Sequence, residues 1–384
     1  MHILIAPDKF KGSLTAEAAA AAIGAGVRRA LPDATIDACP LADGGDGTVD
    51  VLLSAQAGER RTARVTGPLG TPITAHWALL TDGTAVIESA TAAGLALVPQ
   101  HERDPLRTTS RGVGELLLHA LDAGPRRIVI GLGGTATCDG GLGLLSALGA
   151  HVDPATEPFR GGDLLALRGV DVSALDRRLL DAHLIAACDV ASPLFGPQGA
   201  ALMFAPQKGA SPQTAAELDR ALAKLSELAR RALPSADPSA AGTGAAGGLG
   251  FALSAFCGAE LTSGAELVLD AVGITPRLAR ADWVLTGEGA LDQQTLQGKV
   301  VARLARRAAA VHAPVVALTG AERLSVEQLS SSGITASFTL CDGPLSPDDA
   351  KLRARELLEA RAAQVCRLWI AASARGDREH EREP

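Results

Sequence analysis

The sequence contains no tyrosine, and aromatic residues make up only 3% of its 384 positions. Few side chains are therefore available to stack on nucleic-acid bases, and the formal net charge of −7 repels a polyanion. Together these deficits argue against nucleic-acid binding. A small anion remains a suitable ligand wherever the local potential is positive.

Long apolar runs are also missing, because glycine, proline or charged residues interrupt each apolar stretch well before the ~18 residues that a membrane span needs. The first apolar segment, residues 2–6, follows Met1 directly and leaves no room for a secretory signal peptide. The six cysteines are scattered, without CxxC or zinc-ligand spacing. These absences predict a cytoplasmic protein with reduced thiols and no membrane partner.

Lysine is scarce as well, since only six of the 36 Lys and Arg residues are lysines. Four of the six, Lys9, Lys11, Lys208 and Lys299, lie in glycine-bearing loops. Lysine is a compact point charge that can follow a moving phosphoryl group, whereas arginine is a rigid bidentate fork. The distribution favours a phosphate-binding role, and the ordinary alternative is that these are solvated surface lysines.

Six such loops combine glycine with lysine or carboxylate side chains. They cover residues 7–13, 43–48, 131–141, 207–209, 242–250 and 287–299. Glycine lets backbone amides approach an anion closely, helix N-termini add positive potential, and carboxylates hold a hydrated magnesium ion. The pattern predicts a kinase that acts on a small molecule.

The order of strands and helices predicts an α/β fold with two domains, as the length also suggests. Residues 1–60 alternate β-α-β-α in a doubly wound pattern, and the alternation resumes in residues 280–384. Residues 61–279 begin with extended segments, of which 73–80 and 84–88 flank a two-residue turn. We therefore predict that the chain ends share one parallel sheet, that 61–279 is an inserted α/β domain, and that ligands bind in the interdomain cleft.

One segment supports a different enzyme class. Residues 131–136 read G-x-G-x-x-A at the end of a predicted strand, and Asp153 follows about twenty residues later, as in a dinucleotide-binding fingerprint. Residues 137–141 delay the helix that should begin inside this fingerprint, so an NAD-dependent dehydrogenase is the weaker interpretation. A non-catalytic binding protein is weaker still, because anion capture alone does not require so many carboxylates in loops.

The carboxylates after predicted strands have two explanations. Many aspartates at such positions cap helices. Asp43, Asp46 and Asp189 stand out because they combine a loop position with neighbouring glycine or proline. Phosphoryl transfer needs a carboxylate on the metal and usually a second one to orient the attacking hydroxyl.

Read together, the loops resemble those of the type I glycerate kinases, a bacterial family that phosphorylates D-glycerate with ATP. The segments that carry the resemblance are residues 5–13, 42–48, 65–70, 187–190, 199–209, 244–250 and 286–295, which together extend through almost the whole chain. Cys138 and Ser192 stand where the family usually has asparagine. The loss of these two amides predicts an altered affinity or substrate preference if they orient substrate or a metal-bound water.

The resemblance implies a Rossmann-like domain built from both chain ends, an inserted α/β domain, and 2-phosphoglycerate as the product. A kinase for a related hydroxy or sugar acid would share the same loops.

We assign the site residues as follows. Asp189 orients the attacking hydroxyl, while Lys9 and Lys208 complete the catalytic set as cations for phosphoryl or carboxylate oxygens. Asp43 and Asp292 are the expected magnesium ligands, because hard oxygen donors suit this ion. The remaining substrate- and phosphate-binding candidates are Asp8, Lys11, Ser13, Gly44, Gly45, Gly133, Gly134, Thr135, Gly247, Gly248, Gly287, Glu288 and Lys299.

Overall fold

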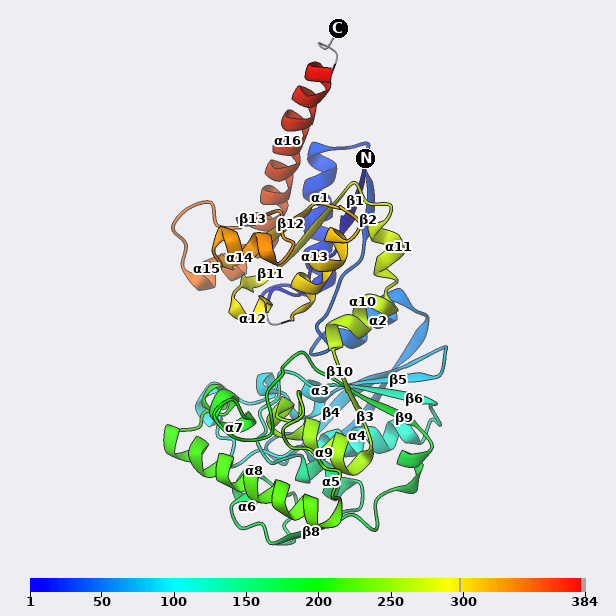
Figure 1. Cartoon of the computed structure of the whole chain (residues 1–384), viewed down its shortest axis with the longest axis vertical. Coiled ribbons are helices and arrows are strands. Elements are labelled where there is room, and N and C mark those ends of the chain that lie inside the picture. The colour runs from blue at the N-terminus through cyan, green and yellow to red at the C-terminus, as the bar shows by residue number, and fades with distance from the viewer. Residues whose placement is uncertain (297, 381–384) are drawn as a thin grey trace. The chain divides into compact units, whose positions relative to one another are not determined.

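The computed structural model describes residues 1–296 and 298–380, with side chains described as far as residue 372 apart from position 297. The chain divides into two compact units (Figure 1). Unit 1 comprises Met1–Ala42 and Val268–Pro384, and unit 2 comprises Asp43–Leu267. As the sequence predicts, the first and last segments of the chain belong together and the middle forms a body of its own.

Unit 1 contains a five-stranded sheet in the order β13-β12-β11-β1-β2, and every neighbouring pair is parallel. The strands are β1 (His2–Ile5), β2 (Thr35–Ala38), β11 (Trp283–Leu291), β12 (Val315–Glu322) and β13 (Ala336–Thr339). The helices are α1 (Ala16–Ala30), α11 (Ile274–Leu278), α12 (Gln293–Leu296), α13 (Val300–Ala309), α14 (Val326–Ser331), α15 (Pro347–Leu352) and α16 (Ala354–His380). This arrangement confirms the predicted doubly wound sheet.

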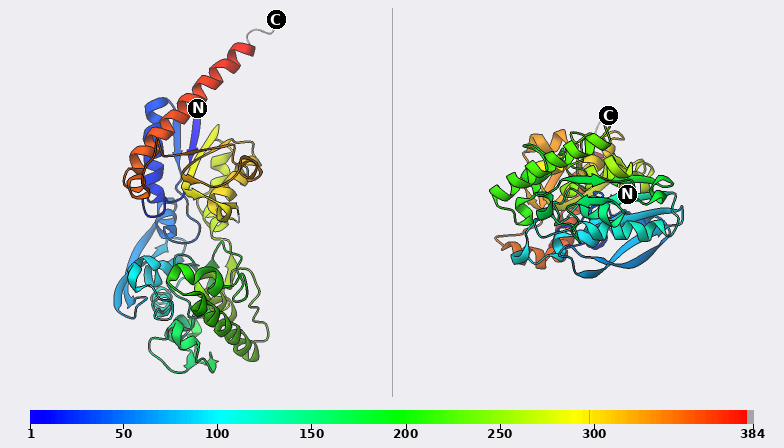
Figure 2. Two further views of the ribbon diagram at one scale, coloured as in Figure 1. Left: turned by 90° about the vertical axis from the view of Figure 1, so that its left-hand side faces the viewer. Right: turned by 90° about the horizontal axis from the view of Figure 1, so that it is seen from below.

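Helices cover both faces of the unit 1 sheet (Figure 2, left). On one face α1 packs against α16, and on the other α11 packs against α13. The α1–α16 contact depends on Gly26, because a Cβ there would lie 2.2 Å from the carbonyl oxygen of Glu359. With both faces covered, the central strands are continuous apolar runs, such as the fully buried Ile3, Leu4 and Ile5 of β1.

Unit 2 contains a six-stranded sheet in the order β10-β9-β6-β5-β4-β3. Strands β3 (Gly58–Thr66), β4 (Pro72–Leu80) and β5 (Thr84–Glu88) are antiparallel neighbours, whereas β5, β6 (Arg127–Gly131), β9 (His183–Ala187) and β10 (Glu260–Thr262) run parallel. A separate antiparallel pair joins β7 (His151–Asp153) and β8 (Gly169–Asp171). Unit 2 is thus the hairpin-rich α/β body that the sequence predicts.

The helices of unit 2 are α2 (Thr48–Ala55), α3 (Ser89–Ala93), α4 (Arg111–Leu121), α5 (Leu142–Ala147), α6 (Gly161–Leu164), α7 (Ala200–Phe204), α8 (Pro212–Ala232) and α9 (Leu249–Cys257). Helix α10 (Gly264–Ala271) contains the junction with unit 1. Short 3-10 helices occur at Leu95–Leu97, Gln100–Glu102, Arg177–Leu180, Pro206–Lys208 and Ala245–Gly247. Leu267 of α10 packs against Val129, Ile185 and Ala187 of the sheet.

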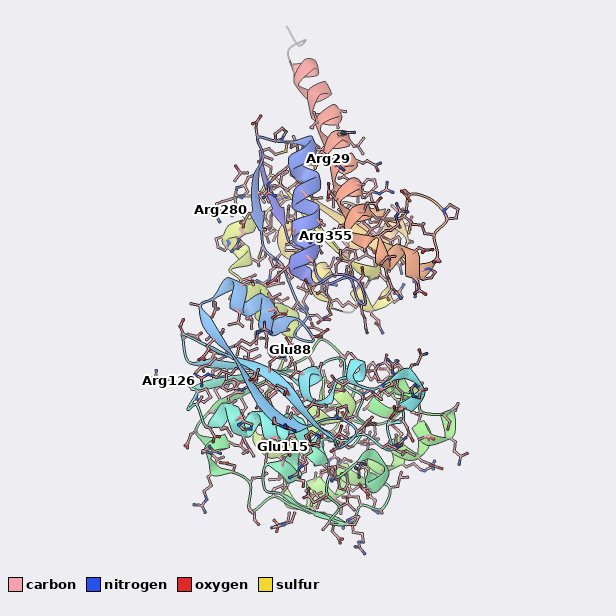
Figure 3. The ribbon with its side chains drawn as sticks, turned by 180° about the vertical axis from the view of Figure 1, so that it is seen from behind. Arg29, Glu88, Glu115, Arg126, Arg280 and Arg355 are labelled. Atoms are coloured by element: carbon pink, nitrogen blue, oxygen red, sulfur yellow. The ribbon has the colours of Figure 1, made fainter. Side chains whose placement is uncertain are left out.

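The boundaries of the units differ from the predicted ones. The sequence predicts junctions after residue 60 and before residue 280, whereas the units divide at 42–43 and 267–268. Helix α2 explains the first difference, because it packs on β3, β4 and β5. The Glu88 carboxylate at the end of β5, labelled in Figure 3, also accepts a hydrogen bond from the Val49 amide of α2 at 2.6 Å.

Two local predictions need correction. The connection between β4 and β5 has three residues, 81–83, because the register pairs Leu79 with Ala85. Strand β11 continues to Leu291 through the glycines that the sequence suggests as a loop.

Within the described residues, no helix is long and apolar enough to cross a membrane. The six cysteines are free thiols, five of them buried.

Candidate active site

The carboxyl ends of β1 and β11 are neighbours at the centre of the unit 1 sheet. From β1 the chain passes through α1 to β2, and from β11 it passes through α13 to β12, on the opposite side. The β1–β11 pair is therefore the point where the winding direction changes, and parallel α/β sheets bind ligands beyond the carboxyl ends of strands at such a point. Residues 7–13 leave the sheet here, beside the second half of β11.

Hydrogen bonds tie these two segments together. The Asp8 amide donates to the Gly287 carbonyl at 2.9 Å, and the Thr286 hydroxyl donates to the Ala6 carbonyl at 2.7 Å. A Cβ at Gly289 would lie 3.2 Å from the amide nitrogen of Lys11, so glycine lets the strand approach the loop closely. The predicted site residues of the 7–13 loop therefore lie close to those of β11.

The side chains of residues 7–13 differ in exposure. Asp8 is buried, and one of its carboxylate oxygens accepts a hydrogen bond from the Lys9 amide at 2.7 Å. Lys9 is half-buried, whereas Lys11 and Ser13 are exposed. The Ser13 hydroxyl donates to the Lys351 carbonyl at 3.0 Å, which anchors the end of the loop to α15. The two lysines therefore supply the cationic side chains of this loop.

Glu288 is a buried carboxylate inside β11, with only 4% of its surface exposed. Burial raises the pKa of Glu288, and the neighbouring Lys299 ammonium opposes that shift. The Lys299 ammonium lies 2.9 Å from Glu288 Oε2, and the Thr295 hydroxyl donates to Glu288 Oε1 at 2.7 Å. Lys299 thus neutralises a carboxylate at the predicted phosphate site.

Asp292 follows β11 and caps α12. Its Oδ1 accepts hydrogen bonds from the amides of Gln294 at 2.9 Å and Thr295 at 3.3 Å. The same oxygen lies 3.9 Å from the Lys299 ammonium. The predicted metal ligand Asp292 is therefore connected to the Glu288 cluster through Lys299 and Thr295.

In unit 2 the loop 43–48 packs against the end of β6 and the start of α10. The Gly45 amide donates to Asp43 Oδ1 at 3.2 Å, which closes a turn around the Asp43 carboxylate. A Cβ at Gly131 would lie 2.1 Å from the Gly44 carbonyl oxygen, and a Cβ at Gly44 would lie 2.5 Å from Gly264 Cα. Glycine at these positions brings the 43–48 loop, the end of β6 and the start of α10 together.

Asp189 lies just after β9 and contacts the same helix start. Its Oδ1 accepts a hydrogen bond from the Ser263 hydroxyl at 2.6 Å, and its Oδ2 accepts one from the Ala265 amide at 3.0 Å. Ser263 also caps α10, because its oxygen accepts a hydrogen bond from the Glu266 amide at 3.2 Å. The positive end of the helix and two donors therefore orient the Asp189 carboxylate.

Lys208 lies beneath the loop 131–141 and is only 4% exposed. Its ammonium donates to the Thr137 carbonyl at 2.7 Å and to the Thr135 hydroxyl at 3.4 Å. Burial lowers the pKa of Lys208, whereas Cys138 and Asp139 oppose that shift. The side chain that the sequence suggests as a mobile cation is thus packed against the loop and holds its backbone.

Asp139 and Cys138 belong to the interior of unit 2. Asp139 accepts hydrogen bonds from the amide and the hydroxyl of Ser110, at 2.8 and 2.7 Å, and from the Gly141 amide at 3.1 Å. Burial raises the pKa of Asp139, and these hydrogen bonds oppose the shift. Burial also raises the pKa of the Cys138 thiol to about 11. Cys138 therefore occupies a core position, as part of the main hydrophobic cluster of unit 2.

The glycines of the loop 242–250 serve close backbone packing. A Cβ at Gly247 would lie 2.0 Å from the Thr137 carbonyl oxygen, and a Cβ at Gly248 would lie 2.7 Å from Gly140 Cα. This loop leads directly into α9. Gly133 lies against Gly45, where its Cβ would be 3.1 Å from the Gly45 Cα.

The dinucleotide fingerprint lacks its structural context. Strand β6 ends at Gly131, but the next helix, α5, begins only at Leu142. Residues 132–141 lie between them, so the fingerprint glycines do not lead directly into the helix N-terminus that should bind a pyrophosphate.

The site residues form two sets, one in each unit. Within residues 1–296 and 298–380, no three His, Cys, Asp or Glu side chains gather closely enough to form a metal centre by themselves. Magnesium suits such a site nonetheless, because it is usually held by one or two carboxylates together with water and substrate phosphates. Asp43 and Asp292 offer hard oxygen donors of this kind.

The role of the α10 N-terminus is not predicted by the sequence motifs. Ser263 and the Ala265 amide together orient Asp189, yet neither was among the predicted residues. A signal was present, because Ser263 and Glu266 have the spacing of a helix capping box. That pattern predicts a helix start but does not identify the carboxylate that it binds.

Comparisons with known proteins agree with the loop pattern. A family model described as the glycerate kinase family matches residues 3–370. The chain is 46% identical to "Glycerate 2-kinase" of Escherichia coli K12, over 91% of this chain and 93% of that protein. It is 43% identical to "Glycerate kinase" of Bacillus subtilis 168, over 95% and 97% of the two chains. A crystal structure of a putative glycerate kinase 2 from Salmonella typhimurium LT2 superposes with a TM-score of 0.80 at 44% identity, covering 97% of this chain and 99% of that one.

Proposed function

Because the chain belongs to the glycerate kinase family, we propose that it transfers a phosphoryl group from ATP to D-glycerate and forms 2-phosphoglycerate. Family membership supports both the kinase activity and glycerate as the class of acceptor. The oriented Asp189 carboxylate is the structural observation that best supports a hydroxyl acceptor. A kinase for a related hydroxy or sugar acid is the alternative within the same chemistry.

Asp189 orients the attacking hydroxyl in this proposal. The Ser263 hydroxyl donates to one oxygen of the Asp189 carboxylate and the Ala265 amide donates to the other. A carboxylate oxygen can accept further hydrogen bonds. A glycerate hydroxyl that donates to Asp189 would be held in one direction and could pass its proton to the carboxylate as the bond to phosphorus forms. Fixing the carboxylate before the substrate arrives avoids reorganisation during the reaction.

The lysines have separate roles. Lys9, half-buried at the switch point of unit 1, supplies positive charge for phosphoryl oxygens, and the exposed Lys11 adds to it. Lys208 acts through the loop 131–141, since its ammonium donates to Thr137 and Thr135 inside unit 2. Lys299 balances Glu288 and keeps Asp292 near a positive charge.

Asp43 and Asp292 would hold magnesium, which neutralises charge on the transferring phosphates when bound. Glycine-loop amides would lie near the phosphates. The free cysteines are consistent with a reducing compartment, and we propose the cytoplasm as the site of the reaction.

The test is ADP release by the full-length protein with ATP, Mg²⁺ and a panel of acids: D-glycerate, L-glycerate, glycolate and a four-carbon sugar acid. The proposal predicts the highest kcat/KM with D-glycerate. ³¹P NMR of the product should show the 2-phosphate. A higher kcat/KM with another acid would select the alternative, and the 3-phosphate as product would refute the regiochemistry. Omission of Mg²⁺ should abolish turnover.

A further inference from the structure

Arg103 is a half-buried arginine of unit 2 that lies between the 3-10 helix Gln100–Glu102 and α4. Its Nε atom is shielded from solvent and has no hydrogen-bond partner within the described part of the chain. Its guanidinium group forms no ion pair with a described residue. A cation that is partly withdrawn from water and lacks an anionic partner is unfavourable, so this arrangement indicates a partner from outside the chain.

Arg361 of α16 in unit 1 is a useful comparison. Its Nε atom is also buried without a hydrogen-bond partner among the described residues. Its terminal nitrogens, however, donate to the Cys341 carbonyl at 3.1 Å and to Gln364 Oε1 at 3.0 Å. Arg361 therefore ties α16 to residue 341, whereas no equivalent bond to a described residue holds the side chain of Arg103.

The backbone of Arg103 is fixed beside the loop 131–141. A Cβ at Gly209 would lie 2.0 Å from the Arg103 carbonyl oxygen, so glycine permits this close contact. The preceding residue, Lys208, donates hydrogen bonds to the loop 131–141. The Thr108 hydroxyl donates to another carbonyl of the same loop at 2.9 Å. The long Arg103 side chain thus starts from a fixed point next to this loop.

The segment that contains Arg103 leaves the sheet at the same edge as Asp189. Strands β5, β6 and β9 are parallel neighbours in unit 2. The segment with Arg103 follows β5, the loop 132–141 follows β6, and Asp189 lies just after β9. Parallel α/β sheets bind ligands beyond the carboxyl ends of their strands, and all three segments begin there.

The acceptor of the proposed reaction is an anion, because a hydroxy acid carries a carboxylate at neutral pH. The carboxylates of Asp43 and Asp189, both assigned to the site in unit 2, repel it. Lys208 is a predicted cation for this carboxylate, but it is buried and holds the backbone of the loop 131–141. A planar guanidinium suits the task, because its fork donates two parallel hydrogen bonds to a carboxylate.

We propose that Arg103 binds the carboxylate of the acid whose hydroxyl Asp189 orients, an assignment that rests on the kinase function proposed above. The terminal nitrogens of Arg103, and not its shielded Nε, make this contact. The substrate thereby supplies the anionic partner that the described chain does not. Arg103 then selects acids over neutral alcohols, and it does so for D-glycerate and for a related hydroxy acid alike.

The first test is calorimetric titration of the full-length protein in the presence of Mg²⁺ and a non-hydrolysable ATP analogue. D-glycerate and its uncharged amide, D-glyceramide, are titrated separately. Arg103→Ala should weaken D-glycerate binding roughly 10- to 100-fold and leave D-glyceramide binding within about twofold. Undiminished D-glycerate binding by Arg103→Ala, or an equal loss for both ligands, would overturn the contact.

The second test is steady-state ADP release. In Arg103→Ala the KM for D-glycerate should rise by a similar factor while kcat stays within about threefold, because the carboxylate keeps its charge throughout the reaction. Arg103→Lys should lose less, since it keeps the charge without the fork. Arg126→Ala is the matched control: Arg126 is an exposed arginine directly before β6, at the other end of that strand (Figure 3). An equal rise in KM in the control would reduce the effect to net charge.

Urea unfolding separates substrate binding from a structural role. Arg103→Ala should keep the stability of the unaltered protein, because its guanidinium forms no ion pair with a described residue.

The two proposals fail in different ways. If the unaltered protein binds D-glycerate through Arg103 but releases no ADP, the kinase function fails and the carboxylate contact stands. Normal ADP release together with undiminished D-glycerate binding in Arg103→Ala would overturn the carboxylate contact alone.

Discussion

The contact between Ser263 and Asp189 gives the sharpest prediction. Ser263→Ala removes two interactions at once: the 2.6 Å hydrogen bond to Asp189 Oδ1 and the cap on the Glu266 amide. Loss of the cap should lower the free energy of unfolding by about 1 kcal/mol. A hydrogen bond to a charged group contributes about 1.5–3 kcal/mol, so kcat should fall between roughly tenfold and 150-fold if the full contribution is felt in the transition state.

The assay is steady-state ADP release with D-glycerate, together with urea unfolding. A matched control is Ser211→Ala, because Ser211 caps α8 by accepting a hydrogen bond from the Thr214 amide at 3.1 Å. The control should lose similar stability and keep its kcat. An equal kcat loss in both variants would show that Ser263 affects activity only through stability. A normal kcat in Ser263→Ala would refute the proposed orientation of Asp189.

Three further predictions concern the packing of the site. Gly44→Ala should destabilise the protein by about 2 kcal/mol more than Gly47→Ala in urea unfolding. Both glycines have positive φ, but only a Cβ at Gly44 would lie 2.5 Å from a backbone atom. Equal losses of unfolding free energy in the two variants would contradict this prediction. Lys299→Met should lower the free energy of unfolding by roughly 2–3 kcal/mol, because the buried Glu288 carboxylate would lose its cationic partner. Adding Glu288→Gln should recover most of that stability. A double variant as unstable as the single one would refute the pairing. Burial lowers the folded-state pKa of Lys208, so the unfolded state binds more protons. Stability should therefore rise with pH from the folded-state pKa up to the ordinary lysine pKa of 10.5. Lys208→Met should lack that rise in unfolding curves measured between pH 7 and 10.5, and an unchanged pH dependence would exclude a buried, titrating Lys208.

The parallel sheet of unit 1 was accessible from the sequence. Its strands are short apolar runs, such as residues 2–5, and helices with clear caps separate them; Thr15, for example, caps α1. Both signals are local, so sequence patterns suffice to find them. The pairing of the two chain ends followed from the continuous apolar character of their strands.

The length of β11 was not accessible in this way. Gly287 and Gly289 suggested a loop, but glycine is needed inside the strand because a Cβ at Gly287 would lie 2.0 Å from the Leu318 carbonyl oxygen. The same ambiguity affects the glycines predicted to surround phosphate. Gly247 and Gly248 allow protein backbones to approach one another, and sequence alone does not distinguish this from approach to an anion.

The burial of Lys208 was equally hidden. Its position in a glycine-bearing loop suggested a mobile cation, whereas tertiary contacts place it under the loop 131–141. The partner of Asp189 was missed for a related reason, because Ser263 is 74 residues away in the chain. Contacts of this range depend on how strands β9 and β10 pair.

The most direct measurement of the central claim compares the kcat and KM of the unaltered protein and of Asp189→Asn in ADP release with D-glycerate. If Asp189 orients the hydroxyl and accepts its proton, kcat should fall on the order of 10²–10⁴-fold with little change in KM. A kcat within about twofold of the unaltered value would contradict the account at its centre.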